Sequence, residues 1–185
     1  SALHEGTCAV RTLEHEWVES HDLPVRIGAP LALDPAEMLP PRQLRRLDRA
    51  SQCALLAARQ AWEQAGAPQV APQRLAVSVS PGMGPVLSVM EAWDTLRDKG
   101  PRRVLPTAVP ALMPNAPAAA VGIELGAHGG IHAPVSACAS GAEAIAYGAD
   151  LITLGRADVV VAGGTDAALH PMTVAAFAAM RALST

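Results

Sequence analysis

The stretch IHAPVSACASGAEAIAYGADLITLGRADVVVAGG, residues 131–164, decides the fold class. It predicts a strand over residues 131–136, a helix over residues 140–154 and a second strand, DVVVA, over residues 158–162. The second strand has no alternation of polar and apolar residues, which is typical of a central parallel strand covered by helices on both faces. The stretch therefore predicts a layered α/β architecture.

The remaining sequence continues this alternation of strands and helices. Residues 74–80 (RLAVSVS) predict a strand that the turn PGMGP ends at residues 81–85. Gly66 is expected to end one helix, and Asn115 to cap another. The apolar spacing and these breaks predict helices over residues 12–20, 44–65, 86–99, 115–125 and 172–182.

Composition narrows the function classes. The chain has 185 residues, of which 50% are hydrophobic and only 3% aromatic, values that exclude disorder and fit one globular domain or a piece of a larger one. A formal net charge of −3 gives no general attraction to nucleic acid or to an anionic membrane. Residues 1–40 are polar and interrupted by prolines, and we expect them to form a covering segment.

Targeting and redox signals are weak. No signal segment opens the chain, and four prolines break the uncharged residues 104–123, so we expect a buried or pocket-lining segment there and no membrane span. The cysteines Cys8, Cys53 and Cys138 are too few and too scattered for a disulfide framework. This usage favours a reduced, cytoplasmic protein.

One cysteine lies where chemistry is expected. In VSACASGAEA, residues 135–144, Cys138 stands between the predicted strand and the predicted helix, and its small neighbours allow a sharp turn with the thiol at the apex. In the first turn of a helix, a cysteine meets unpaired N–H groups and the positive end of the helix dipole, which favour a thiolate and can stabilise an oxyanion. The alternative is a small buried cysteine that only packs.

Three motifs in sequence decide between these alternatives. VSACASGAEAIA, GRADVVVAGGTDAA and AAFAAMRALST resemble, in order and separation, the β-ketoacyl-acyl-carrier-protein synthases, condensing enzymes of the thiolase fold. The resemblance extends through MPNAPAAAVGIELGAHGG, GPRRVLP, LPVRIG and PPRQLRRLDRASQ, and it is closest to type II elongating synthases of actinobacterial fatty-acid or mycolic-acid pathways. It implies that residues 1–185 form the N-terminal half of a ketosynthase domain, without its first strand and its C-terminal half.

The resemblance implies a reaction. Cys138 would take an acyl chain from acyl carrier protein as a thioester, and malonyl carrier protein would lose CO2 and attack that thioester to give a 3-oxoacyl product. The family's two catalytic histidines and its lysine belong to the second half of the fold. His128, His132 and Lys99 do not match them, so we expect residues 1–185 alone to be inactive in condensation.

Other positions match the family's binding surfaces. Arg49 completes an arginine cluster that its spacing places on one side of a helix start, and the alternative for this cluster is a solvated face. Asp166, where many relatives have Glu, is given a supporting role, and Gly163 and Gly164 permit close turning of the backbone. The resemblance assigns carrier-protein binding to Arg42, Arg45, Arg46, Arg102 and Arg103, and the acyl pocket to Met83, Ala108 and Met113, the last two reaching the neighbour's pocket in a homodimer.

Two other function classes remain open. The chain could be a noncatalytic ketosynthase module that dimerises or docks carrier protein, or a cysteine-dependent hydrolase or acyltransferase, which would need a histidine base near Cys138. No P-loop, no GxGxxG after a strand and no metal-ligand spacing occurs in the sequence. We therefore expect no cofactor, no metal and no nucleic-acid partner, while acyl chain length and the choice among fatty-acid, mycolic-acid and polyketide pathways stay open.

Overall fold

The computed structural model describes residues 4–184, which fall into two compact units, one of residues 4–34 with 168–184 and one of residues 35–167. In the first unit, β1 (Arg11–Thr12) pairs antiparallel with β2 (Ile27–Gly28). Its helices are α1 (Glu16–Ser20) and α9 (Pro171–Ala179). The helix predicted from residue 12 begins later, because residues 11 and 12 pair in β1.

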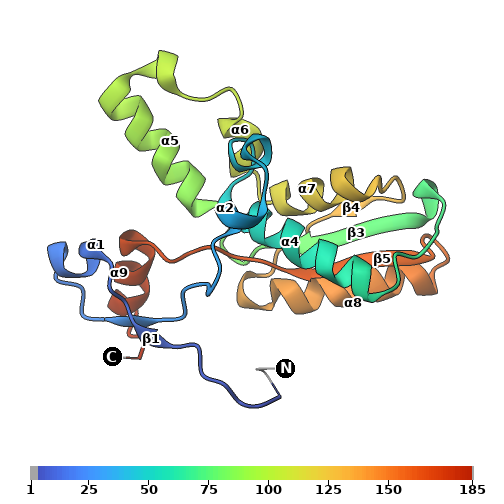
Figure 1. Ribbon diagram of the computed structural model, residues 1–185, viewed down its shortest axis with the longest axis horizontal. Coiled ribbons are helices and arrows are strands. Elements are labelled where there is room, and N and C mark those ends of the chain that lie inside the picture. The colour runs from blue at the N-terminus through green and yellow to red at the C-terminus, as the bar shows by residue number, and fades with distance from the viewer. Residues whose placement is uncertain (1–3, 185) are drawn as a thin grey trace. The chain divides into compact units, whose positions relative to one another are not determined.

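The second unit is built on a three-stranded parallel sheet in the order β4 (Ile131–His132), β3 (Leu75–Ser80) and β5 (Val159–Gly164). Figure 1 shows α4 (Arg49–Gln64) and α7 (Ala116–Leu125) on one face of this sheet and α8 (Ser140–Thr153) on the other. The predicted layered α/β architecture is confirmed.

The core forms on both faces of β3, and all six of its residues are buried. Leu75, Val77 and Val79 pack into the cluster that contains alanines of α4 and α7, and Ala76 packs with Leu151 of α8 on the opposite face. Alternate residues of a strand point to opposite faces, so the face of Ala76 also carries the small buried residues Ser78 and Ser80, while the larger apolar residues occupy the other face.

The sequence predicted the wrong central strand. β3 pairs with β4 and with β5, whereas β5 pairs with β3 alone among the described strands and its residues are only partly buried or exposed. The error has a local cause. Residues 159–162 form a continuous apolar run, whereas β3 carries Ser78 and Ser80, and the partners on either side of a strand are set by contacts far away in sequence.

Several element boundaries differ from the prediction for local reasons. The helix predicted over residues 44–65 begins only at Arg49, because the Asp48 carboxylate accepts the N–H groups of Ala50 at 2.9 Å and Ser51 at 3.1 Å and caps α4. Gly66, with φ of +79°, ends it as predicted. Asn115 stands at the N-cap of α7, but its side chain makes no capping hydrogen bond. The remaining elements are α2 (Pro35–Met38), α3 (Pro41–Leu44), α5 (Val86–Lys99), α6 (Ala108–Leu112) and the short 3-10 turns η1 (Pro72–Arg74), η2 (Pro101–Arg103) and η3 (Ala137–Ala139).

Residues 104–123 are buried only in part. Pro117, Ala118 and Val121 are buried against the sheet, but Leu105 and Val109 are 63% and 62% exposed, so the first half of the expected buried or pocket-lining segment is not buried in this chain. Within residues 4–184, no helix has the length and apolar character needed to cross a membrane.

Candidate active site

Cys138 lies at the apex of a sharp turn between the end of the β4 segment and α8. It belongs to η3 and precedes Ala139, the N-cap of α8, so it lies just before the helix rather than in its first turn. Ala137 before it has φ of +52°, a left-handed conformation that is uncommon for a residue with a Cβ. The thiol is exposed, so in this chain Cys138 is not a buried packing residue.

The turn is braced from within by Ser140. Its hydroxyl accepts the N–H of Ser136 at 2.8 Å and donates to the carbonyl of Ala137 at 2.7 Å. Ser140 is only 2% exposed. Its hydroxyl therefore holds the backbone on both sides of the position where the chain reverses before Cys138.

A hollow of about 270 Å³ opens beside Cys138. It lies where β3 and β5 end and α8 begins, since Ser80 and Gly164 are the last residues of those strands and Gly141 is the second residue of α8. Clefts outside the carboxyl ends of parallel strands are the usual place for binding sites in α/β proteins. The lining residues are Ser80, Gly82, Ala137, Cys138, Ser140, Gly141, Gly164, Thr165 and Asp166.

Glycines allow the hollow to form so close to the backbone. A Cβ on Gly164 would lie 2.8 Å from the Cα of Gly141, which leaves no space for a side chain. By contrast, a Cβ on Gly163 would meet nothing within 4 Å. Only one glycine of the predicted pair is therefore required for the close approach of α8 to β5.

Asp166 ties a second loop to the turn at Cys138. Its carboxylate accepts the N–H groups of Gly82 at 2.8 Å and Met83 at 3.2 Å. A Cβ on Gly82 would lie 3.0 Å from the carbonyl oxygen of Ala137, so the Gly82–Met83 loop lies directly against the cysteine turn. Asp166 thus stabilises the wall of the hollow. This geometry agrees with the expectation that Asp166 has a supporting rather than a catalytic role.

None of the three expected acyl-pocket residues lines the hollow beside Cys138. Met83 is 45% exposed on the loop that Asp166 holds, next to the lining residue Gly82. Ala108 lies at the start of α6, and Met113 lies just after that helix. Within the described chain, the hollow beside Cys138 is therefore formed without them.

The basic residues do not share one helix face. Arg42 lies in α3 and Arg49 begins α4, because the Asp48 cap separates the two helices. The predicted single basic side of one helix start is therefore wrong. All five residues assigned to carrier-protein binding are exposed, namely Arg42, Arg45, Arg46 and, in η2, Arg102 and Arg103.

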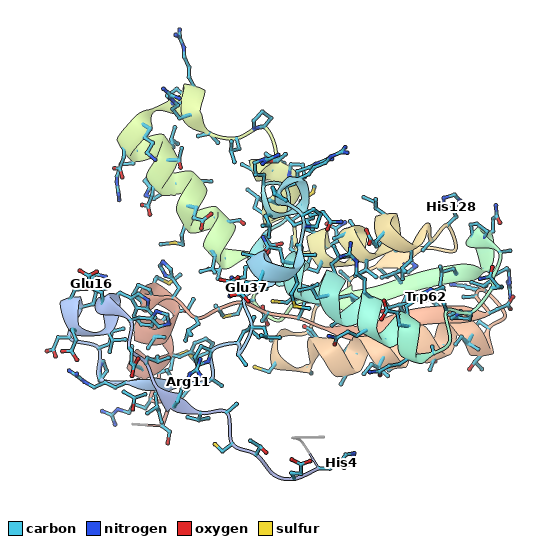
Figure 2. All side chains as sticks on the ribbon, in the orientation of Figure 1. His4, Arg11, Glu16, Glu37, Trp62 and His128 are labelled. Atoms are coloured by element: carbon cyan, nitrogen blue, oxygen red, sulfur yellow. The ribbon has the colours of Figure 1, made fainter. Side chains whose placement is uncertain are left out.

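No residue of the described chain supplies an obvious base to Cys138. Figure 2 shows His128 on the loop after α7, and its N–H donates to the carbonyl of Pro72 at 2.8 Å, so it lies at the end of the sheet where β3 begins. His132 contacts the ring of Tyr147, and Lys99 is the exposed last residue of α5. None of the residues that line the hollow is a histidine or a lysine, and residues 4–184 contain no cluster of three His, Cys, Asp or Glu side chains suited to a metal ion.

The site contains residues that the sequence analysis missed. Ser80, Ser140 and Thr165 all line the hollow, and the Ser80 hydroxyl is buried without a hydrogen-bond partner. Ser140 was accessible to sequence reasoning, since a serine at the start of a helix commonly bonds to nearby backbone groups. The contributions of Ser80 and Thr165 depend on the pairing of β3 with β5, which no local pattern reveals.

Solved structures share this fold. A β-ketoacyl synthase from Burkholderia phymatum STM815 superposes with a TM-score of 0.82 at 30% identity, over 99% of this chain and 45% of its own. A type II polyketide ketosynthase bound to a hexaketide, in complex with its acyl carrier protein, has a TM-score of 0.72 at 20% identity, over 80% of this chain and 43% of its own. The fold is therefore that of the N-terminal half of the thiolase-like ketosynthases.

The sequence agrees with the fold. The chain matches the family described as "Beta-ketoacyl synthase, N-terminal domain" over residues 1–185, and it belongs to that family. The 3-oxoacyl-[acyl-carrier-protein] synthase 2 of Mycobacterium tuberculosis (strain ATCC 25618 / H37Rv) is 42% identical over 172 residues, which make up 93% of this chain and 41% of that protein. The chain thus spans less than half the length of these relatives, and the resemblance stated from the motifs is confirmed.

Proposed function

We propose that the protein carrying this chain is a 3-oxoacyl-[acyl-carrier-protein] synthase that elongates acyl chains in fatty-acid or mycolic-acid synthesis, and that Cys138 is its nucleophile. The observation that carries the proposal is the exposed thiol at a strand-to-helix turn, beside a hollow of about 270 Å³ at the carboxyl ends of parallel strands. The 42% identity to a mycobacterial 3-oxoacyl synthase supports the choice of reaction.

The chemistry of the first step needs little more than the turn itself. The Cys138 sulfur attacks the thioester carbonyl, a new sulfur–carbon bond forms, the carrier's sulfur–carbon bond breaks, and the proton passes to the departing carrier thiol. Of the backbone N–H groups that follow Cys138, those of Ala139 and Ser140 donate to the Ser136 and Ala137 carbonyls, so the later N–H groups of the first turn of α8 would stabilise the oxyanion of the tetrahedral intermediate. The turn thus supplies a nucleophile and an electrostatic partner without a cofactor.

The second step needs groups from outside this chain. Malonyl carrier protein loses CO2, its carbanion forms a carbon–carbon bond with the thioester carbonyl, and the Cys138 thiolate leaves. No histidine or lysine of the described residues lines the hollow. We expect residues 1–185 alone to stop at the acyl thioester, and steady release of 3-oxoacyl product from them would contradict this.

Intact mass spectrometry tests the nucleophile. The protein is weighed before and after incubation with long-chain acyl carrier protein, beside Cys138→Ala and, as a matched control at another exposed cysteine, Cys8→Ala. An acyl adduct in the parent and in Cys8→Ala but not in Cys138→Ala supports the proposal. Equal adducts in all three chains, or none in the parent, contradict it.

Carrier-protein docking is the second part of the proposal. The exposed Arg42, Arg45 and Arg46, with Arg102 and Arg103, offer positive charge to an acidic carrier protein. The pair Arg45→Glu and Arg46→Glu should weaken carrier binding more at 50 mM than at 500 mM salt, because exposed charges are screened. Arg156→Glu reverses one charge at an exposed arginine beyond α8; it is the control for each of the two single substitutions and should leave binding unchanged.

Chain-length selection is the third part. We assign Met83 to the wall of the protein's own acyl pocket, and Ala108 and Met113 to the pocket of the second subunit of a homodimer in the cytoplasm. Ala108→Phe should then shift product toward shorter chains in the full-length dimer. An unchanged product distribution would remove these two residues from the pocket.

A noncatalytic module is the competing function. It is favoured by one observation, that no histidine or lysine of the described chain lines the hollow. Such a module would bind carrier protein through the arginines but would take no acyl group onto Cys138. The mass measurement separates the two functions.

A further inference from the structure

The backbone before Cys138 is held in an unfavourable conformation. Ala137 has φ of +52°, where its Cβ is crowded by its own backbone, and it is the one residue of η3 in the left-handed region. A left-handed residue with a Cβ persists only where surrounding contacts enforce it, and such residues are common at active sites. The contacts that enforce it here are therefore of functional interest.

Ser140 makes contacts of the required kind. Its hydroxyl receives the Ser136 N–H at 2.8 Å and donates its own proton to the Ala137 carbonyl at 2.7 Å, so one oxygen bridges both sides of the left-handed residue. Ser140 is 2% exposed, and water has little access to replace these bonds. The same residue lines the hollow together with Cys138.

We propose that Ser140 is a positioning residue, which holds Ala137 in its left-handed conformation and thereby directs the Cys138 thiol toward the hollow. This inference deepens the proposed function, since it concerns catalysis only where Cys138 is the nucleophile. It makes a prediction that a general role in starting α8 does not make. Glycine adopts positive φ without steric strain, so glycine at position 137 should replace the need for the Ser140 hydroxyl.

The test compares two cysteines in one protein. In the full-length protein, the rate at which iodoacetamide alkylates Cys138 is divided by the rate for the exposed Cys8 of the other unit, with peptide masses as the readout. Ser140→Ala, which loses both hydrogen bonds, should lower this ratio by about tenfold. Adding Ala137→Gly to Ser140→Ala should restore most of the loss, and Ser140→Thr, which keeps a hydroxyl, should retain most of the parent ratio.

Ser136→Ala is the matched control. Ser136 contributes only its backbone N–H to the bridge, so removing its hydroxyl should leave the ratio within about twofold of the parent. A ratio that Ser140→Ala leaves unchanged, or a loss that Ala137→Gly does not repair at all, would overturn the inference. If Ser140→Ala does not fold, the double variant decides, since folding restored by glycine supports the inference and an unfolded double variant overturns it.

Acyl transfer from carrier protein to Cys138 is measured on the same variants. Parallel losses in acylation and alkylation support both proposals. A parent protein whose alkylation follows these expectations but which takes no acyl group would overturn the proposed function and leave the role of Ser140 standing.

Discussion

The two ends of the strand pair β3 and β5 are held in different ways. Where the strands begin, the Arg74 side chain bonds Asp158 at 3.0 Å and donates to the Gly155 carbonyl at 2.7 Å, and the two charged side chains are 37% and 60% exposed. Where the strands end, the backbone of Gly164 approaches that of Gly141 too closely for a side chain. Long solvated side chains can adjust to a change, whereas two backbones in contact cannot. The turn that carries Cys138 lies at the carboxyl end of the strand pair, where the contact between the two backbones fixes its geometry.

Gly164→Ala should have the largest effect on stability, because it adds a side chain where the two backbones are in contact. The added Cβ would lie 2.8 Å from the Cα of Gly141, so α8 or β5 must move. Overpacking of this kind costs about 1–3 kcal/mol. We expect a loss of that size in the free energy of unfolding measured with urea, together with a loss of about tenfold or more in Cys138 acylation.

Gly163→Ala is the matched control. Its Cβ would meet nothing within 4 Å, so its free energy of unfolding should stay within about 0.5 kcal/mol of the parent value. Equal effects at the two glycines would mean that close backbone approach does not hold this end of the sheet.

Asp166→Ala, also at the carboxyl end of the strand pair, should have a smaller effect on stability. It removes the acceptor of the Gly82 and Met83 N–H groups and frees the loop that lies against Ala137. Because Asp166 is exposed, the loss in stability should be about 1 kcal/mol or less, with acylation of Cys138 slowed about threefold to tenfold. The rate is obtained by stopping acylation reactions at successive times and measuring the acylated fraction by intact mass spectrometry.

Asp166→Asn refines this prediction. Its amide keeps an acceptor oxygen, so the acylation rate of this variant should lie between that of Asp166→Ala and that of the parent. Asp150→Ala removes an exposed carboxylate from α8, away from the hollow, and should leave the rate unchanged. If Asp150→Ala slows acylation as much as Asp166→Ala does, overall charge rather than loop attachment would be responsible.

Local patterns predicted the parts of the fold that local physics determines. The strand at residues 74–80, the helices α5 and α8, and the sharp turn at Cys138 follow from apolar spacing and from small residues beside the cysteine. The Asp48 cap was also readable, since aspartate is a preferred N-cap, and its use would have separated α3 from α4.

Contacts between distant segments of the sheet could not be predicted from local sequence patterns. Asp166 and Gly82 are 84 residues apart, and nothing in either segment alone indicates that they meet. The choice of β3 over β5 as the central strand depends on pairing in the same way, because the strand with the more continuous apolar run is not the one with two partners. The turn that carries Cys138 was therefore predictable, and most of the wall of the hollow beside it was not.

Asp158→Asn should reduce stability less than Gly164→Ala or Asp166→Ala does, since it acts where the strands begin and the side chains are solvated. The hydrogen bond from Arg74, aided by its charge, holds the pKa of Asp158 below its ordinary value, and burial opposes this. A carboxylate with a lowered pKa in the folded state stabilises that state fully above the unfolded value of about 3.9, and this stabilisation is lost as the pH falls through the folded value.

The difference in urea-unfolding free energy between the parent and Asp158→Asn should therefore be present at pH 7, shrink below about pH 4 and shrink also in 1 M salt. Arg74 remains charged throughout, because the same bond raises its pKa. A loss at pH 7 as large as that of Gly164→Ala, or one that grows toward acid, would mean that the ion pair fixes the register of β3 and β5. The Arg74–Asp158 pair would then determine how β3 and β5 align, and the close packing at Gly164 would be a consequence of that alignment.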